Sequence, residues 1–281
     1  MNKLIQQPQI MGILNITPDS FSDGGKYTDT QAAIDKGRRM VEEGANIIDI
    51  GGESTRPGAK RMPASVQIER VLPVIEGLKQ NLPVDIIISI DTTLAEVAEA
   101  AINAGASMIN DISAGRDDVQ MFMLAASKKL PLVLMHMQGT PKDMQNNPSY
   151  SNVTDEMLTF LSERIRQAKA MGVEENNIIL DPGIGFGKAF EHNLEILRQL
   201  DKLVEVGYPV LLSASRKRFL HTLCNNKEFS GLCGATCAIT ALGINAGVSI
   251  FRVHDVQENR QTADITFALR NSSIATTTQK D

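Results

Sequence analysis

The chain has 281 residues, of which 42% are hydrophobic and 22% are charged, and its formal net charge is −5 at pH 7. A chain of this length buries a large core without disulfides or structural metals. Its slightly acidic balance excludes a nucleic-acid binder that relies on a basic surface, although a small cationic pocket for an anion remains compatible with it.

Other features of the composition predict where the protein works. No apolar run reaches the roughly 18 residues of a membrane-spanning helix, and the opening "MNKLIQQPQI" lacks the apolar centre of a signal peptide. The three cysteines, Cys224, Cys233 and Cys237, form no C-x-x-C pair and no metal-binding spacing. We therefore expect a cytoplasmic protein with neither a membrane nor a nucleic acid among its partners.

Eight short apolar runs recur along the chain and predict buried strands. Most are continuous rather than alternating, as in parallel strands that are covered on both faces. They occupy residues 10–16, 46–52, 85–91, 107–113, 131–137, 177–183, 209–215 and 249–254.

Helical patterns fill the intervals between these strands. The segment 92–106 begins with the spacing of a capping box, and we expect Thr93 to cap this helix. Residues 153–172 place an apolar side chain at every turn, and residues 255–270 begin with Asp255 as the expected cap. Glycine, which readily takes the left-handed conformation that follows a helix, ends five of the patterns. These glycines are at positions 44, 105, 172, 207 and 247.

Strand and helix alternate eight times, which predicts a single-domain (β/α)8 TIM barrel. An open, doubly wound parallel sheet shares the local pattern and is the alternative. Eight units without a shift in composition favour the closed barrel. We expect the barrel to span residues 1–271 and residues 272–281 to form a flexible C-terminal tail.

Every predicted strand ends in a polar or charged side chain. Since the C-terminal strand ends of a barrel form one rim, these side chains should converge there. A single one of them would be interpreted as a helix cap or a turn residue, but a set from all strands indicates a site. His136 is interpreted equally well as a core histidine. The other candidates are Asn15, Thr55, Arg56, Asp91, Asn110, Asp181, Ser215, Lys217, Arg252 and His254.

The cationic candidates follow the last two strands, where barrels of this kind usually bind phosphate. Lys217, Arg252 and His254 are suited to a phosphate or diphosphate, with Ser215 as a further donor. Asn15, on the opposite side, would supply an oxygen to a phosphate-bound Mg²⁺, an ion that takes few protein ligands and keeps its waters.

The acidic and amide candidates end three other strands. Asp91, Asn110 and Asp181 lie among apolar neighbours, where carboxylates are costly unless they meet hydrogen-bond donors. A flat heterocycle with several N–H groups, such as an aminopyrimidinone, supplies such donors. Metal ligation or acid–base catalysis by the two aspartates remains an alternative. The segment "DPGIGFGK" lacks the spacing of a nucleotide-binding motif, and we interpret it as a close-approach loop that offers Phe186 as an apolar wall.

Three predicted strand-to-helix connections are long, at residues 18–30, 53–65 and 138–152. Connections beyond roughly 6 residues in such units are commonly lids or binding loops. The first two contain Phe21 and Arg56, which would close on a ligand.

Several motifs occur in the order known from one family. "MGILNITPDSFSDGG", "IIDIGGESTRPG", "SIDT", "MINDIS", "LMHMQGTP", "LDPGIGFGK", "SRK" and "RVHDV" resemble dihydropteroate synthase of folate biosynthesis, from Gly12 to about Val256. The resemblance implies a homodimeric transferase with Mg²⁺ as cofactor. Such enzymes condense 6-hydroxymethyl-7,8-dihydropterin diphosphate with p-aminobenzoate, form 7,8-dihydropteroate and release diphosphate. Sulfonamides compete for the aminobenzoate pocket.

The resemblance also implies a role for each candidate residue. The pterin diphosphate contacts would be Thr55, Asp91, Asn110, Met137, Asp181, Lys217, Arg252 and His254. The aminobenzoate side would consist of Phe21, Thr55, Arg56, Pro57, Phe186 and Ser215, and the Mg²⁺ ligand would be Asn15. Asp91, Asp181, Lys217 and Arg252 would be catalytic. Arg218 stands where some members have serine, so a hydroxyl contact to aminobenzoate does not carry over to that position.

The residues offer no strong base to activate an arylamine, which favours a mechanism in which diphosphate leaves first. Carboxylates on one side of the pocket would stabilise the pterin cation, and cations on the other side would stabilise the leaving anion. Three other functions remain as alternatives: a corrinoid-linked methyltransferase, a non-catalytic pterin-binding protein, and an aldolase that forms a Schiff base at Lys217.

Overall fold

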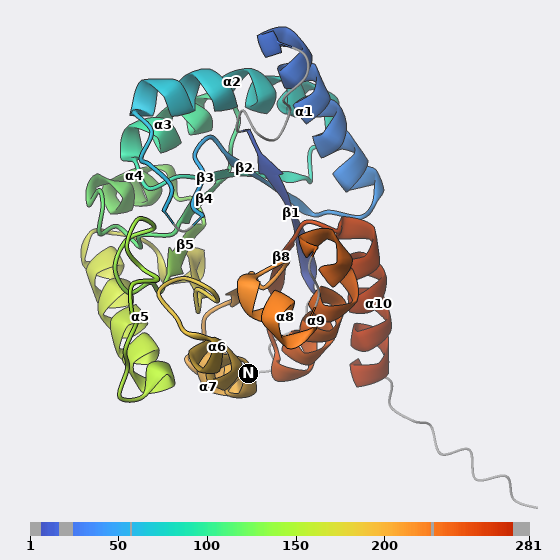
Figure 1. Cartoon of the computed structure of the whole chain (residues 1–281). Helices are drawn as coiled ribbons and strands as arrows, with labels where there is room; N and C mark the ends of the chain where they lie inside the picture. The colour runs from blue at the N-terminus through green and yellow to red at the C-terminus, as the bar shows by residue number, and fades with distance from the viewer. Residues whose placement is uncertain (1–6, 17–24, 57, 226–227, 272–281) are drawn as a thin grey trace, which may run out of the picture.

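Parallel strands form a ring that is enclosed by helices (Figure 1). The computed structural model describes residues 7–16, 25–56, 58–225 and 228–271. The strands are β1 (Gln9–Asn15), β2 (Ile47–Gly51), β3 (Ile87–Asp91), β4 (Met108–Asp111), β5 (Leu132–Met135), β6 (Ile178–Asp181), β7 (Leu211–Leu212) and β8 (Ile250–Val253). The helices are α1 (Gly25–Glu42), α2 (Ala64–Asn81), α3 (Ala95–Ala104), α4 (Gln120–Lys128), α5 (Val153–Ala170), α6 (Phe190–Arg198), α7 (Leu200–Glu205), α8 (Arg218–Leu223), α9 (Cys233–Ala246) and α10 (Val256–Asn271).

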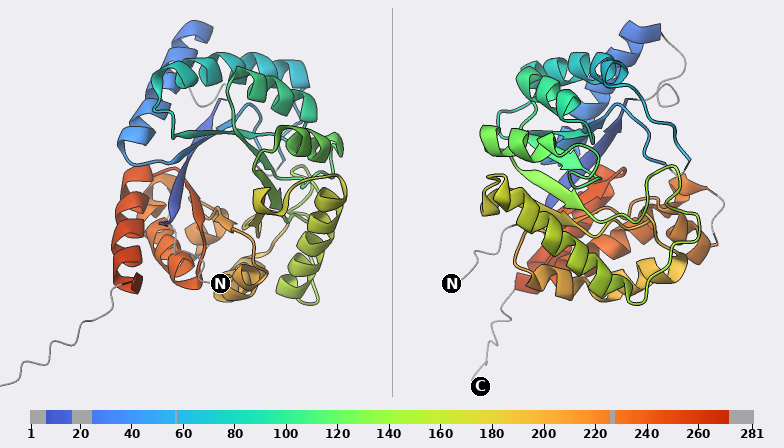
Figure 2. Two further views of the ribbon diagram at one scale, coloured as in Figure 1. Left: turned by 180° about the vertical axis from the view of Figure 1, so that it is seen from behind. Right: turned by 90° about the vertical axis from the view of Figure 1, so that its left-hand side faces the viewer.

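Pairing around the ring confirms the predicted barrel and excludes the open sheet. The strands follow the order β6-β5-β4-β3-β2-β1-β8-β7, and neighbouring strands are parallel. A bridge between Leu180 and Val210 joins β6 to β7 and closes the ring. Figure 2 shows from two further sides that the helices lie outside the strands. The tail predicted at 272–281 lies outside the described residues.

The interior of the barrel is apolar at one end and polar at the other. Alternate residues of a strand face the same side. One inward-facing residue of each strand contributes to an apolar cluster, called the apolar plug below, which lies nearer the N-terminal ends of the strands. This cluster is formed by Met11, Ile47, Ile87, Met108, Val133, Ile179, Leu211 and Ile250. Two positions further along the same strands stand Ile13, Asp49, Ser89, Asn110, Met135, Asp181, Ser213 and Arg252. The two-residue period therefore places a mostly polar set directly above the plug.

The helices agree with the sequence in most respects. The five glycines predicted to end helices all have positive φ angles. In α5, the side chain of Asn152 accepts hydrogen bonds from the first turn, and Met157, Leu161 and Ile165 are buried as predicted. Helix α1 begins at Gly25 and so takes up part of the first predicted loop. Among the described helices, none is long and apolar enough to cross a membrane.

The predicted cap of α3 is wrong. Leu94 occupies the capping position, and the Ala95 N–H donates 2.9 Å to the carboxylate of Asp118 in the next strand-to-helix loop. The Thr93 hydroxyl instead accepts a hydrogen bond of 2.8 Å from Arg61. A tertiary contact has replaced the local cap because a carboxylate is the better acceptor at a helix N-terminus.

The apolar plug should dominate the stability of the barrel. Truncating the fully buried Ile47 by Ile47→Ala leaves a cavity and should lower the free energy of unfolding by about 2–5 kcal/mol. The matched control is Val84→Ala. Val84 is 93% exposed, so this substitution should change the free energy of unfolding by less than about 0.5 kcal/mol. Urea denaturation followed by circular dichroism measures both. Equal effects of the two changes would contradict this role of the plug.

Candidate active site

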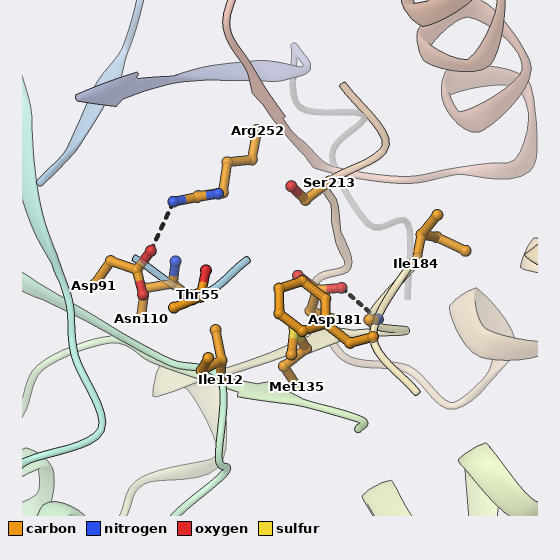
Figure 3. A pocket seen from close by; sticks show the side chains of 11 residues that line it. Thr55, Asp91, Asn110, Ile112, Met135, Asp181, Ile184, Ser213 and Arg252 are labelled. Atoms are coloured by element: carbon orange, nitrogen blue, oxygen red, sulfur yellow. Dashed lines mark hydrogen bonds and ion pairs between the residues drawn. The ribbon is translucent and has the colours of Figure 1, made fainter. Parts of the chain in front are cut away.

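A pocket opens at the C-terminal ends of the strands, above the apolar plug (Figure 3). Its polar lining comes from different strands, which brings together side chains that are distant in sequence. The pocket is lined by Thr55, Asp91, Asn110, Ile112, Met135, Asp181, Gly183, Ile184, Phe186, Ser213 and Arg252. In Figure 3, Asp91 and Asp181 lie on opposite sides of the pocket. The predicted convergence of the strand ends is therefore confirmed for these residues.

Arg252 connects two carboxylates at the base of this pocket. Its Nε donates 2.6 Å to Asp49 Oδ2, and its Nη2 donates 2.7 Å to Asp91 Oδ2. Asp49 Oδ2 also accepts a hydrogen bond of 3.0 Å from the amide of Asn110. Arg252 was expected on a cationic side apart from the carboxylates. The structure differs, because this guanidinium is paired with both carboxylates.

Asp49 is a residue that the sequence reasoning missed. It lies in the middle of an apolar run, so it did not stand out as a strand end. Its side chain is completely buried and holds both Arg252 and Asn110. The signal was available: an acidic residue inside a buried strand is rare unless it is paired.

Several buried oxygens around the network lack partners. Asp49 Oδ1, Asp91 Oδ1 and Ser89 Oγ accept no hydrogen bond from the described residues. Burial raises the pKa of Asp91, although Arg252 opposes the shift. Burial also raises the pKa of Asp181, whose Oδ1 accepts a hydrogen bond of 2.7 Å from the Gly183 N–H. Since buried acceptors are normally satisfied, Asp91 in the pocket lining is suited to a ligand that donates N–H groups.

Lys217 lies at the edge of the site against an aromatic ring. Its Nζ is 4.2 Å from the centroid of the Phe186 ring, which is the arrangement of a cation–π contact. Burial and the nearby charge of Arg252 lower the pKa of Lys217, whereas Asp181 and Asp91 raise it. The predicted Phe186 wall and the predicted cation are thus in contact.

Ser215 and His254 form a pair beyond the ends of β7 and β8. The Ser215 hydroxyl lies 3.0 Å from His254 Nδ1 and accepts 3.2 Å from the His254 N–H. Burial, followed by repulsion from Arg216, Arg252 and other cations, lowers the pKa of His254 to about 3. Ser215 was predicted from its position as a further phosphate donor, and from the resemblance on the aminobenzoate side; its contact here is with His254, a residue predicted to bind diphosphate.

His136 belongs to the core rather than to the pocket lining. It is buried, and its ring lies 5.1 Å from that of Phe160 in an edge-to-face arrangement. Burial lowers the pKa of His136 to about 2, so the ring is neutral at physiological pH. Met137 is also buried, in an apolar cluster with Met144 and the pocket residues Ile112, Met135 and Phe186.

Asn15 ends β1 on the same side of the barrel as Asp91. Its Oδ1 and Asp91 Oδ2 are both 3.6 Å from the position that a Cβ would take on Gly51. Among the described residues, no group of three or more His, Cys, Asp or Glu side chains could hold a metal ion. A metal here would therefore depend on few protein oxygens, as is usual for phosphate-bound Mg²⁺.

The long loops after β2 and β5, at residues 53–65 and 138–152, meet above the strands. The Gly58 N–H donates 3.0 Å to the Pro141 carbonyl. At the base of the second loop, Glu53 accepts 2.7 Å from the Met62 N–H, and Arg61 forms an ion pair with Asp117. Arg56 is exposed within this loop. Phe21 and Pro57 lie outside the described residues.

Comparison with known proteins shows which family this chain resembles. Residues 11–254 match the family model described as pterin binding enzyme. A protein named dihydropteroate synthase, from Streptococcus pyogenes serotype M3 (strain ATCC BAA-595 / MGAS315), is 48% identical over 252 residues, which cover 89% of this chain and 91% of that protein.

Solved structures with the same enzyme name share the fold. One is the crystal structure of the dihydropteroate synthase of Clostridium difficile in the presence of pteroic acid. It matches this structure with a TM-score of 0.89 at 42% sequence identity, and the match covers 97% of this chain and 100% of that chain. The Yersinia pestis enzyme in a sulfonamide drug complex has a TM-score of 0.88 and 40% identity, with 95% of each chain covered. This chain therefore belongs to the pterin binding enzyme family, together with these dihydropteroate synthases.

Proposed function

We propose that this protein is a transferase that condenses 6-hydroxymethyl-7,8-dihydropterin diphosphate with p-aminobenzoate to 7,8-dihydropteroate and diphosphate. The observation that carries the proposal is the arrangement of Asp91, Asn110 and Asp181 around a pocket beside Lys217. Family membership and relatives named for this reaction support it over a corrinoid-linked methyltransferase.

The pterin ring would lie between the strand-end carboxylates. Its amino and imino N–H groups would donate to the buried carboxylates of Asp91 and Asp181, which have lone pairs available. Asn110 would add the amide contact, and Asp49 would keep Asn110 and Arg252 in place for it. A ligand without these donors would leave buried acceptors unpaired, so the site discriminates strongly.

The diphosphate would lie towards the ends of β7 and β8. Lys217 and His254 would bind it there, and Ser215 would orient the His254 ring through its contact with Nδ1. The anion would favour the protonated imidazole, since it opposes the repulsion that keeps His254 neutral. Mg²⁺ would fit beside the diphosphate because β1 pairs with β8 and Asn15 at the end of β1 offers one hard oxygen; when bound, the ion would neutralise phosphate charge.

Loss of the diphosphate comes first in this mechanism. The bond between the pterin methylene and the phosphate oxygen breaks, and its electron pair leaves with diphosphate. The carboxylates of Asp91 and Asp181 stabilise the positive charge that remains on the pterin. The arylamine nitrogen of p-aminobenzoate then forms the new bond to the methylene and releases a proton.

The aminobenzoate ring would lie against Phe186, with Arg56 near its carboxylate. The second loop would exclude water from the cation, and its backbone contact with Pro141 supports that position. The roles predicted for Phe21 and Pro57 remain part of the proposal. A sulfonamide would compete at the same place, as the Yersinia pestis complex suggests by analogy.

A homodimer is also part of the proposal, and helices α9 and α10 support it. Helix α9 contains no charged residue, although one face of it is exposed. Leu242 on α9 and Ile265 and Leu269 on α10 are 65%, 59% and 70% exposed, respectively. An exposed face that carries large apolar side chains and no charge on α9 is typical of a protein–protein contact, so we propose that a second copy packs here. A cytoplasmic location fits the three free cysteines.

Turnover tests the proposed function directly. With pterin diphosphate, p-aminobenzoate and Mg²⁺, the purified protein should form 7,8-dihydropteroate and diphosphate in equal amounts, as measured by chromatography and a coupled phosphate assay. Removing Mg²⁺ with a chelator should slow the reaction, and adding it back should restore the rate. Tight pterin binding without product would instead identify a non-catalytic pterin-binding protein.

Two substitutions should affect the binding of the two substrates separately. Asp181→Asn should weaken pterin binding by about tenfold or more, because a charged acceptor is lost, as measured by calorimetry. Arg56→Ala should raise the KM for p-aminobenzoate by about tenfold and leave pterin binding unchanged. Arg166→Ala, which removes an exposed arginine on α5, is the control. If both test variants affected the binding of both substrates equally, the assignment of a pterin side and an aminobenzoate side of the pocket would be wrong.

The dimer can be tested at the apolar face. Leu269→Glu should shift the protein from dimer to monomer in size-exclusion chromatography with light scattering, because it buries a charge in the interface. Val84→Glu, at a side chain that is 93% exposed, should leave the mass unchanged. A wild-type protein that is monomeric at every concentration would refute the dimer.

A further inference from the structure

Lys188 is a buried lysine that neither substrate would touch. Its side chain lies at the end of the glycine loop between β6 and α6, and the residue is only 2% exposed. Its Nζ donates to three backbone carbonyls, at 3.2 Å to His136, 2.9 Å to Gly183 and 3.0 Å to Phe186. An ammonium group has three N–H donors, so its full capacity is used within the loop and the neighbouring strand end.

The loop that Lys188 holds has no room to shift towards β5. Gly183 has a φ of +65°, and a Cβ at this position would lie 1.9 Å from the His136 carbonyl oxygen. Gly187 has a φ of +60°, and a Cβ there would lie 2.4 Å from the Gln138 carbonyl oxygen. The loop thus packs directly against the backbone that follows β5, and Lys188 joins the two segments.

Further side chains hold the outer side of the same loop. The Tyr150 hydroxyl donates 2.6 Å to the Gly187 carbonyl, and the Gln145 amide donates 2.7 Å to the Gly185 carbonyl. Lys188 differs from them because it is the charged member and holds the carbonyls nearest the pocket. Its loss would remove the Lys188 donor from both pocket-side carbonyls, and the Gly183 carbonyl would keep only the Phe186 N–H, at 3.0 Å.

The held loop carries the apolar wall of the pocket. Ile184 and Phe186 line the pocket, and the Phe186 ring lies beneath the ammonium of Lys217. The Gly183 N–H, in the same loop, donates to Asp181. The position of this short segment therefore decides where the apolar wall lies relative to the Asp181 carboxylate, which would bind the pterin.

We propose that Lys188 is a positioning residue whose charged ammonium fixes the Ile184–Phe186 wall for p-aminobenzoate. The inference rests on the proposed function, because it takes that wall as the aminobenzoate side. Lys188 contacts neither substrate and acts through the loop backbone.

The charge of Lys188 responds to pH near neutrality. Burial lowers its pKa to about 7; Asp181 opposes this shift, and Lys217 and Arg116 reinforce it. His136, which faces it from the end of β5, is neutral. Below this pKa the ammonium donates to all three carbonyls. Above it the neutral amine keeps two N–H groups, so one of the three carbonyls loses its hydrogen bond from Lys188 and the loop is held less firmly.

Kinetics of matched variants test the role. Lys188→Met keeps the length of the side chain but removes the charge, and it should raise the KM for p-aminobenzoate by about tenfold, the usual effect of one lost charge-assisted hydrogen bond. The KM for pterin diphosphate should change much less. Lys202→Met, at an exposed lysine on α7, is the control and should change neither value. Equal changes in both KM values would overturn the proposal.

The pH dependence distinguishes positioning from general destabilisation. In the wild-type protein, the KM for p-aminobenzoate should rise as the pH passes upward through about 7, while the folded fraction stays constant. Lys188→Arg keeps a charge at every pH and should abolish that rise, whereas Lys188→Met should have a high KM throughout. A wild-type KM that is constant across this range would refute the charged role.

Hydrogen exchange separates this inference from the proposed function. Amide protection of residues 183–187, corrected for intrinsic exchange, should fall in Lys188→Met and in the wild-type protein above pH 7, and it should be unchanged in Lys202→Met. This measurement requires no turnover. An inactive wild-type protein with these protection changes would refute the proposed function alone, and unchanged protection would refute the role of Lys188.

Discussion

The bridge from Arg252 to Asp49 and Asp91 is the interaction on which the site depends. A guanidinium and two carboxylates are buried together, and each would be costly alone. Their mutual pairing allows polar groups to stand directly above the apolar plug of the barrel. Among the described residues, one oxygen of each carboxylate has no hydrogen-bond partner. The bridged pocket therefore still has acceptors for a donor-rich ring.

The ion pairs that Arg252 forms with Asp49 and Asp91 affect which cations of the site would bind an anion. Arg252 neutralises carboxylates that would otherwise repel each other, so its full charge is not available to a leaving anion. In the proposed mechanism, Lys217 and His254 take that task. Burial, and repulsion from nearby cations that include Arg252, lower the pKa of both groups. An arriving diphosphate would reverse this effect, so substrate binding itself completes the charged state of the site.

The glycine loop after β6 serves the site through its backbone. Its glycines permit close approach to the end of β5, and polar side chains hold its carbonyls from several directions. Such a loop has little freedom. A rigid wall suits the proposed reaction, which must position one ring against another before the new bond forms.

Much of this architecture could be predicted from the order of residues. Continuous apolar runs, helix-ending glycines and polar strand ends are local patterns, and backbone geometry alone relates them to a barrel with its site at one rim. The family motifs then implied the role of each candidate. The pairing of Arg252 with Asp49, the capping of α3 by Asp118 and the burial of Lys188 were not predictable in this way. Each joins residues from different strand-to-helix units, and such partners are brought within a few ångströms only when the units pack together; the pair of Arg252 and Asp49 also requires β8 to meet β1.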